Sequence, residues 1–296
     1  MISISRRLRS AILLTGATAV SAGCGVGQPP DDLSSIGREV DLAHLLAGDA
    51  PVEASFVLLS PTAELTFHNP ERSKERFLPA STFKIPNTLI ALETGVASDA
   101  GFTIPFDSIR DRRGGFWTGE WSQDQTLRSA FQNSVYWFYQ ELARRVGEAR
   151  MREYLRRFDY GNQDMGGGID RFWLEGALRI SPLEQVEFLR KVHEGSLGVS
   201  SRSTEILEEI MILQERPEYV LRGKTGTADV TASRELAWLI GFVDVGGSPW
   251  YFALNLEGEE VWERWGLPQA RQQLVVKILY ELGVLSDPDP TVQEGL

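Results

Sequence analysis

The sequence is organised around one stretch, Pro79-Ala80-Ser81-Thr82-Phe83-Lys84-Ile85-Pro86-Asn87, which is followed by an apolar run from Leu89 to Leu92. Residues three apart on an α-helix lie on the same face, so a helix here places the Lys84 amine beside the Ser81 hydroxyl. A serine becomes an effective nucleophile when a base removes its proton, and burial favours the neutral amine that such a base requires. The stretch therefore predicts a serine nucleophile with a lysine base, in a first turn that Pro86 distorts.

Composition sets the class of protein. A chain of 296 residues with 42% hydrophobic and 24% charged residues can bury a large core, as one large domain or as two lobes that share a cleft. The formal net charge is −11. Nucleic-acid binding needs clustered Lys and Arg, so the sequence predicts no nucleic-acid partner.

The N-terminal segment has the layout of a bacterial export signal. Three arginines and no acidic residue lie within the first ten positions, and a short apolar stretch and a run of small residues follow. We predict a signal peptide at 1–23, a spacer at 24–50, and an exported protein in the periplasm or cell envelope. Cys24 is the only cysteine and sits at the expected cleavage point, where the pattern leaves open whether it is lipidated and anchors the protein in the membrane.

Strand patterns lie at the two ends of the chain and helical patterns lie between them. The predicted strands are 54–60, 64–68, 219–222, 236–245 and 250–256, the first two as a hairpin. The predicted helices are 127–146, 148–158, 181–193, 204–213 and 268–282, and Ser181-Pro182-Leu183-Glu184 is a strong helix start. We therefore expect an α+β fold at 51–285: an antiparallel sheet flanked by terminal helices, a helical lobe at about 83–214, and a C-terminal tail at 286–296.

Several kinds of site are disfavoured. The three histidines, His44, His68 and His193, do not have the spacing of metal ligands, so no metal site is predicted. His193, late in a helix, is expected to interact with the helix C-terminus. The chain also lacks a Gly-x-Ser-x-Gly sequence, which argues against an α/β-hydrolase nucleophile elbow.

Two motifs downstream support the Ser81 stretch. A Ser-x-x-Lys alone is expected by chance about once in a chain of this length. Here it is followed by Ser134, on a polar step inside an apolar helical segment, and by Lys224-Thr225-Gly226-Thr227 on a predicted strand. A Lys-Thr-Gly is expected by chance in only about one such chain in ten.

Together, and in this order, these motifs resemble the motif set of the penicillin-recognising serine enzymes. Further segments resemble class D β-lactamases in particular: Tyr160-Gly161-Asn162, Phe172-Trp173-Leu174-Glu175-Gly176 and Trp238-Leu239-Ile240-Gly241. The resemblance covers roughly residues 54–284. It implies a β-lactamase and D,D-peptidase-like fold, hydrolysis of the β-lactam amide of penicillin-type antibiotics, and β-lactam resistance.

The resemblance also implies roles for single residues. Ser81 corresponds to the acylated nucleophile, and Lys84 to the lysine that binds carbon dioxide, becomes N6-carboxylysine and acts as general base; no other cofactor is implied. Trp173 corresponds to the tryptophan that holds this carbamate, Ser134 to the proton relay, and Lys224 to the source of positive potential.

The substrate-binding residues follow in the same way. Arg271 and Thr225 correspond to the pair that binds the β-lactam carboxylate, a task that suits a guanidinium. Gly226 gives close backbone access to a ligand. The main-chain N–H groups of Ser81 and Thr227 would form the oxyanion hole.

One position departs from the family pattern. The family has Ser-x-Val where this chain reads Ser134-Val135-Tyr136. Tyr136 would then either restrict the deacylating water or support the carbamate through its hydroxyl. Two alternatives to the β-lactamase are a β-lactam sensor or penicillin-binding protein that is acylated without turnover, and a D,D-peptidase. The sequence is compatible with a monomer or a homodimer.

Overall fold

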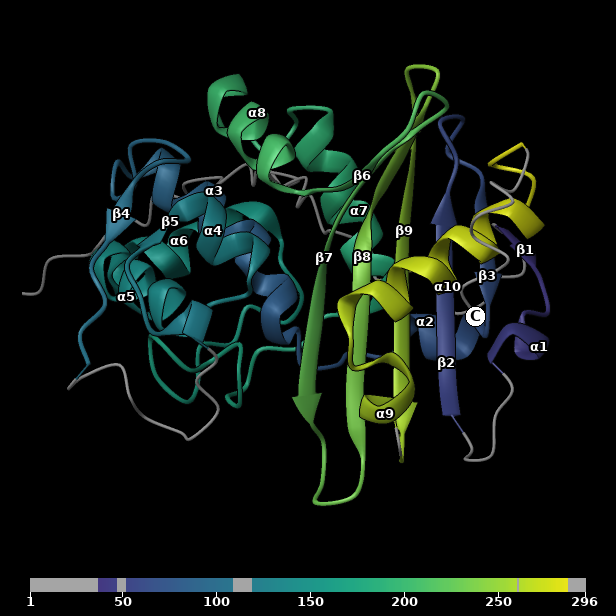
Figure 1. Cartoon of the computed structure of the whole chain (residues 1–296), viewed down its shortest axis with the longest axis horizontal. Coiled ribbons are helices and arrows are strands. Elements are labelled where there is room, and N and C mark those ends of the chain that lie inside the picture. The colour runs from purple at the N-terminus through teal and green to yellow at the C-terminus, as the bar shows by residue number, and fades with distance from the viewer. Residues whose placement is uncertain (1–36, 47–51, 109–118, 260, 287–296) are drawn as a thin grey trace, which may run out of the picture. The chain divides into compact units, whose positions relative to one another are not determined.

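The computed structural model describes residues 37–46, 52–108, 119–259 and 261–286, which all lie within one compact unit, Asp32–Leu296 (Figure 1). The predicted signal peptide, Cys24 and all but the first residue of the predicted tail lie outside the described residues. Within the described ranges, no helix combines the length and the apolar character that a membrane span needs.

Seven described strands form one sheet in the order β1-β3-β2-β9-β8-β7-β6. Their bounds are β1 Gly37–Glu39, β2 Val52–Leu59, β3 Leu65–His68, β6 Ile212–Glu215, β7 Val220–Asp229, β8 Glu235–Val245 and β9 Ser248–Gly258. Every neighbouring pair is antiparallel except β1 and β3. The predicted N-terminal hairpin is confirmed, and the C-terminal strands are longer than their apolar cores suggested.

Part of the predicted spacer is structured. Residues 37–46 contain β1 and the short helix α1, Ala43–Leu46. Leu42 and Leu46 are buried in the core on one face of the sheet. Strand β1 is three residues long and has no buried residue, so the sequence offered no apolar pattern to mark an edge strand that pairs with β3.

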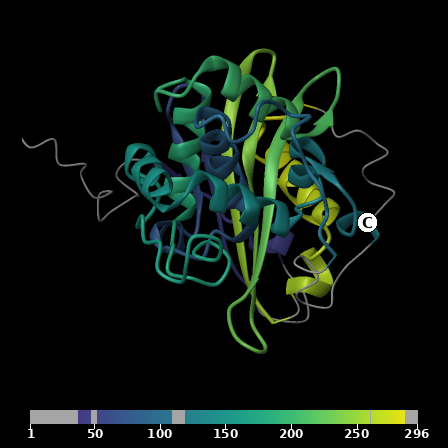
Figure 2. The ribbon, with the colours of Figure 1, turned by 90° about the vertical axis from the view of Figure 1, so that its left-hand side faces the viewer.

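Helices cover both faces of the sheet. On one face α9, Val261–Trp265, and α10, Pro268–Glu281, pack on residues such as Leu239 and Leu254. The opposite face packs against α7, Pro182–His193, and the helical lobe. In Figure 2 the yellow α10 lies on one side of the green strands and most of the teal helices on the other. The predicted α+β architecture, with terminal helices and a helical lobe, is therefore confirmed.

The helical lobe contains α3 Lys84–Glu93, α4 Leu127–Gln132, α5 Tyr136–Val146, α6 Glu148–Phe158 and α8 Ser201–Ile210, with a small hairpin of β4 Thr103–Ile104 and β5 Gln125–Thr126. The prediction for α6 is confirmed, and Ser181 and Glu184 form the predicted capping box. His193 in the last turn of α7 pairs with Glu208 at 2.8 Å.

Two predicted helices are wrong in their bounds. The single helix 127–146 is in fact α4 and α5, because Ser134 has a left-handed φ of 57° and Val135 is extended. The helix 204–213 begins earlier, where Ser200 accepts a hydrogen bond from the N–H of Ser203, and ends at Ile210. Residues from Ile212 onward pair with β7 instead.

Candidate active site

Ser81 and Lys84 are brought together as predicted. Ser81 lies in a 3₁₀ turn, η2 Ala80–Phe83, which continues into α3, where Pro86 lies in the first turn. The Lys84 Nζ is 2.8 Å from the Ser81 Oγ. The Lys84 side chain is fully buried. This burial and, secondly, the positive charge of Lys224 hold the pKa of Lys84 well below its usual range.

Neighbouring segments hold the nucleophile turn in place. Ala80 has a left-handed φ of 49°, and its N–H donates to the main-chain oxygen of Trp173 at 3.0 Å. The indole of Trp173 is fully buried and stacks on Phe83, with ring centroids 5.1 Å apart. The structure thus places Trp173 against the residue that precedes Lys84.

Tyr139 is a site residue that the sequence analysis missed. The Lys84 Nζ lies 5.3 Å from the centroid of the Tyr139 ring, which is fully buried. Helix α3 holds this tyrosine at two points, because its hydroxyl is 2.9 Å from the Thr88 Oγ1 and its main-chain oxygen accepts from Asn87 Nδ2 at 3.2 Å. In the sequence, the position of Tyr139 on one face of α5 could have identified it. That face can be assigned only when the helix is known to start at Tyr136.

Tyr136 faces a different neighbour. Its ring packs edge-on against Trp121, with centroids 5.4 Å apart. Trp121 also donates its indole N–H to the main-chain oxygen of Asn133 at 3.0 Å. The two roles predicted for Tyr136, towards the deacylating water or the carbamate, stay predictions.

Ser134 occupies the turn between α4 and α5. Its N–H donates to the main-chain oxygen of Phe131 at 3.2 Å, which closes the left-handed turn. The Lys224 Nζ lies 5.7 Å from the centroid of the same Phe131 ring. Phe131 therefore contacts both the turn that carries Ser134, through its main-chain oxygen, and Lys224 on β7, through its ring.

Strand β7 packs directly on the nucleophile turn. A Cβ on Gly226 would lie 3.0 Å from the main-chain oxygen of Pro79 and 3.2 Å from the nitrogen of Thr82, closer than most Cβ contacts in proteins. Glycine thus allows the Lys224-Thr225-Gly226-Thr227 strand to approach Ser81. Burial and, secondly, the charge of Arg271 lower the pKa of Lys224 to about 7.

Arg271 is almost fully buried and is bound mainly to main-chain oxygens. Only 2% of the residue is exposed. Its guanidinium donates to the main-chain oxygens of Gly226, Trp238 and Gly266, at 2.8, 3.0 and 2.9 Å, and to Thr227 Oγ1 at 3.2 Å. These bonds tie α10 to β7 and β8, and they leave the side chain little surface for a substrate carboxylate. Burial lowers the pKa of Arg271 to about 10.

Comparisons with known proteins agree with this site. A model of the penicillin-binding protein transpeptidase domain matches residues 60–280. The chain is 42% identical to the β-lactamase OXA-48 of Klebsiella pneumoniae over 191 residues, which cover 64% of this chain and 69% of that protein. It is 40% identical to OXA-10 of Pseudomonas aeruginosa over 209 residues, 70% of this chain and 77% of that one.

Solved structures point the same way. The class D β-lactamase YbxI from Nostoc superposes with a TM-score of 0.71 at 36% sequence identity, covering 79% of this chain and 95% of that one. The C-terminal domain of the Bacillus licheniformis BlaR penicillin receptor superposes with a TM-score of 0.74 at 30% identity, covering 84% and 97%. Its motifs lie around Ser81, and the similarity covers most of the sheet and the helical lobe. The chain therefore belongs to the class D serine β-lactamases.

Proposed function

We propose that this protein hydrolyses the amide bond of β-lactam antibiotics through an acyl-enzyme on Ser81, with Lys84, as N6-carboxylysine, as the general base. One observation carries the proposal: a fully buried lysine amine, whose pKa is held well below its usual range by that burial, lies 2.8 Å from a serine hydroxyl. A neutral amine accepts a proton, whereas an ammonium cannot.

In the acylation step, the Ser81 Oγ attacks the β-lactam carbonyl carbon while its proton passes towards Lys84. The carbonyl oxygen becomes an oxyanion, for which the N–H groups of Ser81 and Thr227 are the proposed donors, and a donor of this kind contributes about 3 kcal/mol. The ring C–N bond then breaks, and the departing nitrogen receives a proton through Ser134. Lys224 favours the anionic substrate at this end of the site.

The surroundings of Lys84 suit N-carboxylation. This reaction needs a neutral amine shielded from water, and Lys84 is covered by Tyr139 and by the segment of Phe83 that stacks on Trp173. Carbon dioxide adds to such an amine with release of a proton, and the carbamate oxygens can then accept protons from the serine and from the hydrolytic water. We assign Trp173 and Tyr139 to the walls that hold this group.

A second function, that of a β-lactam sensor, is favoured by one observation, the likeness to the BlaR receptor domain. The chain aligns with 33% of the length of the Bacillus licheniformis regulatory protein BlaR1, at 36% identity over 206 residues. A sensor is acylated once and stays acylated, whereas a β-lactamase releases its product and reacts again.

Turnover of a chromogenic cephalosporin separates the two functions. The purified protein should hydrolyse many molar equivalents, and added bicarbonate should raise the steady-state rate. A single stoichiometric burst without further hydrolysis would support the sensor. A steady state that bicarbonate and carbon dioxide removal both leave unchanged would reject the carbamate while leaving the serine mechanism in place.

We expect kcat/KM to fall as the pH rises above about 7. Below that pH Lys224 is protonated and supplies positive charge to the anionic substrate, and it loses this charge as the pH passes its lowered pKa of about 7. The pH profile of kcat/KM reports groups of the free enzyme and is therefore the measurement to make. In Lys224→Arg, whose guanidinium stays charged, the alkaline decline should move to higher pH. A decline at the same pH in this variant would show that another group causes it.

The N-terminal pattern supports export, and an exported enzyme would meet β-lactams before they reach the cell-wall enzymes. We propose that it confers resistance. Expression of the full chain in a susceptible host should raise the inhibitory concentration of penicillins, and the Ser81→Ala chain should not. Equal protection by both chains would rule out a catalytic basis for resistance.

A further inference from the structure

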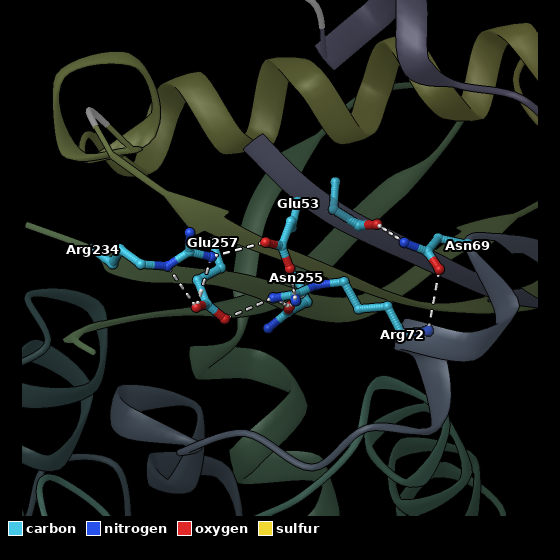
Figure 3. A network of polar contacts seen from close by, with 7 residues as sticks. Glu53, Asn69, Arg72, Arg234, Asn255 and Glu257 are labelled. Atoms are coloured by element: carbon cyan, nitrogen blue, oxygen red, sulfur yellow. Dashed lines mark hydrogen bonds and ion pairs between the residues drawn. The ribbon is translucent and has the colours of Figure 1, made fainter. Parts of the chain in front are cut away.

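A second polar cluster contains Glu53, Arg72, Arg234, Asn255 and Glu257 (Figure 3). The strand register places it on the same sheet face as the Ser81 site, further along one row of residues. Ser55 on β2 is opposite Asn255 on β9, Asn255 is opposite Trp238 on β8, and Trp238 is opposite Gly226 on β7. Residues directly opposite in antiparallel strands point to the same face. The row therefore leads from Asn255 to the glycine that packs on the nucleophile turn.

The chain segment that leads to Ser81 follows this row. It begins in the short helix α2, Pro70–Lys74, where the Arg72 guanidinium donates to Asn255 Oδ1 from Nε at 3.1 Å and from Nη2 at 2.7 Å. The Arg72 Cζ lies 4.3 Å from the centroid of the Phe77 ring, and this ring packs edge-on against Trp238 at 6.0 Å. The Trp238 indole donates to the main-chain oxygen of Leu78 at 3.0 Å, three residues before Ser81.

The same cluster holds the turn that follows the Lys-Thr-Gly strand. Glu257 accepts from Arg72 Nη2 at 3.1 Å and from Arg234 Nε and Nη2 at 3.2 and 3.1 Å. Glu53 accepts from the same two arginines at 3.3 and 3.0 Å. Arg234 stands at the end of the turn between β7 and β8. Two carboxylates thus bind both the segment before Ser81 and the turn after Gly226.

We propose that Arg72 is a positioning residue, which together with Glu257 and Arg234 sets the position of the Ser81 segment relative to the Lys224-Thr225-Gly226-Thr227 strand. The inference rests on the proposed function and adds to it residues that touch no substrate. Arg72 suits this task because its planar fork binds Asn255 from two nitrogens while its face stacks on Phe77, which a lysine cannot do.

Because Arg72 and Asn255 are buried, their hydrogen bonds hold one fixed geometry. Arg72 is 4% exposed and Asn255 is fully buried, so neither is free to exchange its partner for water. A displacement of about 1 Å at reacting atoms can lower a rate by about 10²-fold. The oxyanion donors proposed above come from both segments, so a shift between the segments should slow acylation.

The pocket of Lys84 should respond much less to the same shift. Tyr139 and Trp173 belong to the helical lobe and its loops, and Phe83 lies in the Ser81 turn itself, so none of these walls is part of the sheet. The larger cause of the lowered Lys84 pKa is burial, and only the smaller one, the charge of Lys224, comes from β7. Loss of the Arg72 anchor should therefore lower the rate of acylation and leave the bicarbonate affinity of Lys84 unchanged. General loosening of the structure would weaken both together.

The test compares Arg72→Met, Arg72→Lys and Arg234→Gln with the wild type, below their melting temperatures. Stopped-flow acylation by a chromogenic cephalosporin should fall by about 10- to 100-fold in Arg72→Met and by less in Arg72→Lys. In the double variant Arg72→Met with Arg234→Gln, the fold-decrease in the acylation rate should be smaller than the product of the fold-decreases in the two single variants. Both arginines act through Glu257, so their effects are not independent. Bicarbonate titration of the steady-state rate should give the same half-saturation in each protein.

Arg190→Lys is the matched control, since Arg190 also binds two glutamates, on the surface of α7 and away from Asn255. It should acylate at the wild-type rate. Wild-type rates in folded Arg72→Lys and Arg234→Gln, or a parallel loss of bicarbonate affinity, would overturn the inference. A wild type that is not acylated at Ser81 would instead refute the proposed function, and a wild type without bicarbonate dependence would refute only the carbamate.

Discussion

Ser81→Ala is expected to abolish covalent reaction with β-lactams. Without the Oγ atom there is no nucleophile for the lactam carbonyl, and loss of a serine nucleophile lowers kcat by on the order of 10⁶-fold in serine hydrolases. Intact-protein mass spectrometry after incubation with a penicillin should show no adduct, and hydrolysis should drop to the background rate. The fold should persist, because the Ser81 side chain is only partly buried.

The control for this experiment is Ser196→Ala, since Ser196 is an exposed serine of the turn after α7. It should form the adduct and turn over at the wild-type rate. An adduct of the penicillin mass on Ser81→Ala would show that another residue is the nucleophile. Peptide mapping of the wild-type adduct should place it on the peptide that contains Ser81.

Lys84→Met is expected to stop turnover and to stabilise the protein. Methionine is of similar length and apolar, so it removes the base and opens little space in the core. General-base catalysis contributes on the order of 10²- to 10⁴-fold, and kcat should fall by this amount. An acyl-enzyme that does form should persist, because the same group is proposed to activate the hydrolytic water.

The gain in stability follows from proton linkage. The pKa of Lys84 is depressed in the folded protein, whereas an unfolded lysine titrates near about 10.4. Because the folded protein disfavours the charged amine, Lys84 lowers the stability of the wild type at pH 7, and the Met variant avoids this cost. The Tm of Lys84→Met should exceed that of the wild type at pH 7 in the absence of carbon dioxide, and this difference should shrink as the pH rises towards 10.

Lys191→Met, on the surface of α7, serves as the control, and it should leave kcat and the pH dependence of Tm unchanged. Wild-type turnover by Lys84→Met would show that a different group is the base. A Tm that does not rise would show that the pKa of Lys84 is not depressed in the folded protein, which contradicts the neutral amine that the proposed carbamate needs.

Local sequence was sufficient where the signal lay within a few neighbouring residues. The capping box of Ser181 and Glu184 sets the start of α7, and the spacing of Ser81 and Lys84 places the two side chains together on any helix. Alternating and apolar runs identified the strands of the hairpin and of β8 and β9. Such features depend on backbone geometry over one or two turns, and the whole fold has little freedom to alter them.

The helix boundaries show where local sequence was not sufficient for the prediction. The pattern from 127 to 146 predicts one helix with a polar step inside it, yet the chain breaks at Ser134, within that step. The break is held by distant groups, since Trp121 donates to the main-chain oxygen of Asn133. The left-handed conformation of Ser134 is supported by a contact between residues 12 positions apart in the chain. A local sequence pattern does not reveal such a contact.

The sequence by itself determined the family and the candidates for its chemistry: a serine and a lysine three residues apart, then Ser134, then a Lys-Thr-Gly strand. Only the tertiary structure decided what surrounds them. It placed Tyr139 beside the Lys84 amine, turned Arg271 towards main-chain oxygens, and bound Arg72, in the segment before Ser81, to Asn255. The physical reason is that burial, pKa and hydrogen-bond partners arise from contacts between segments far apart in the chain.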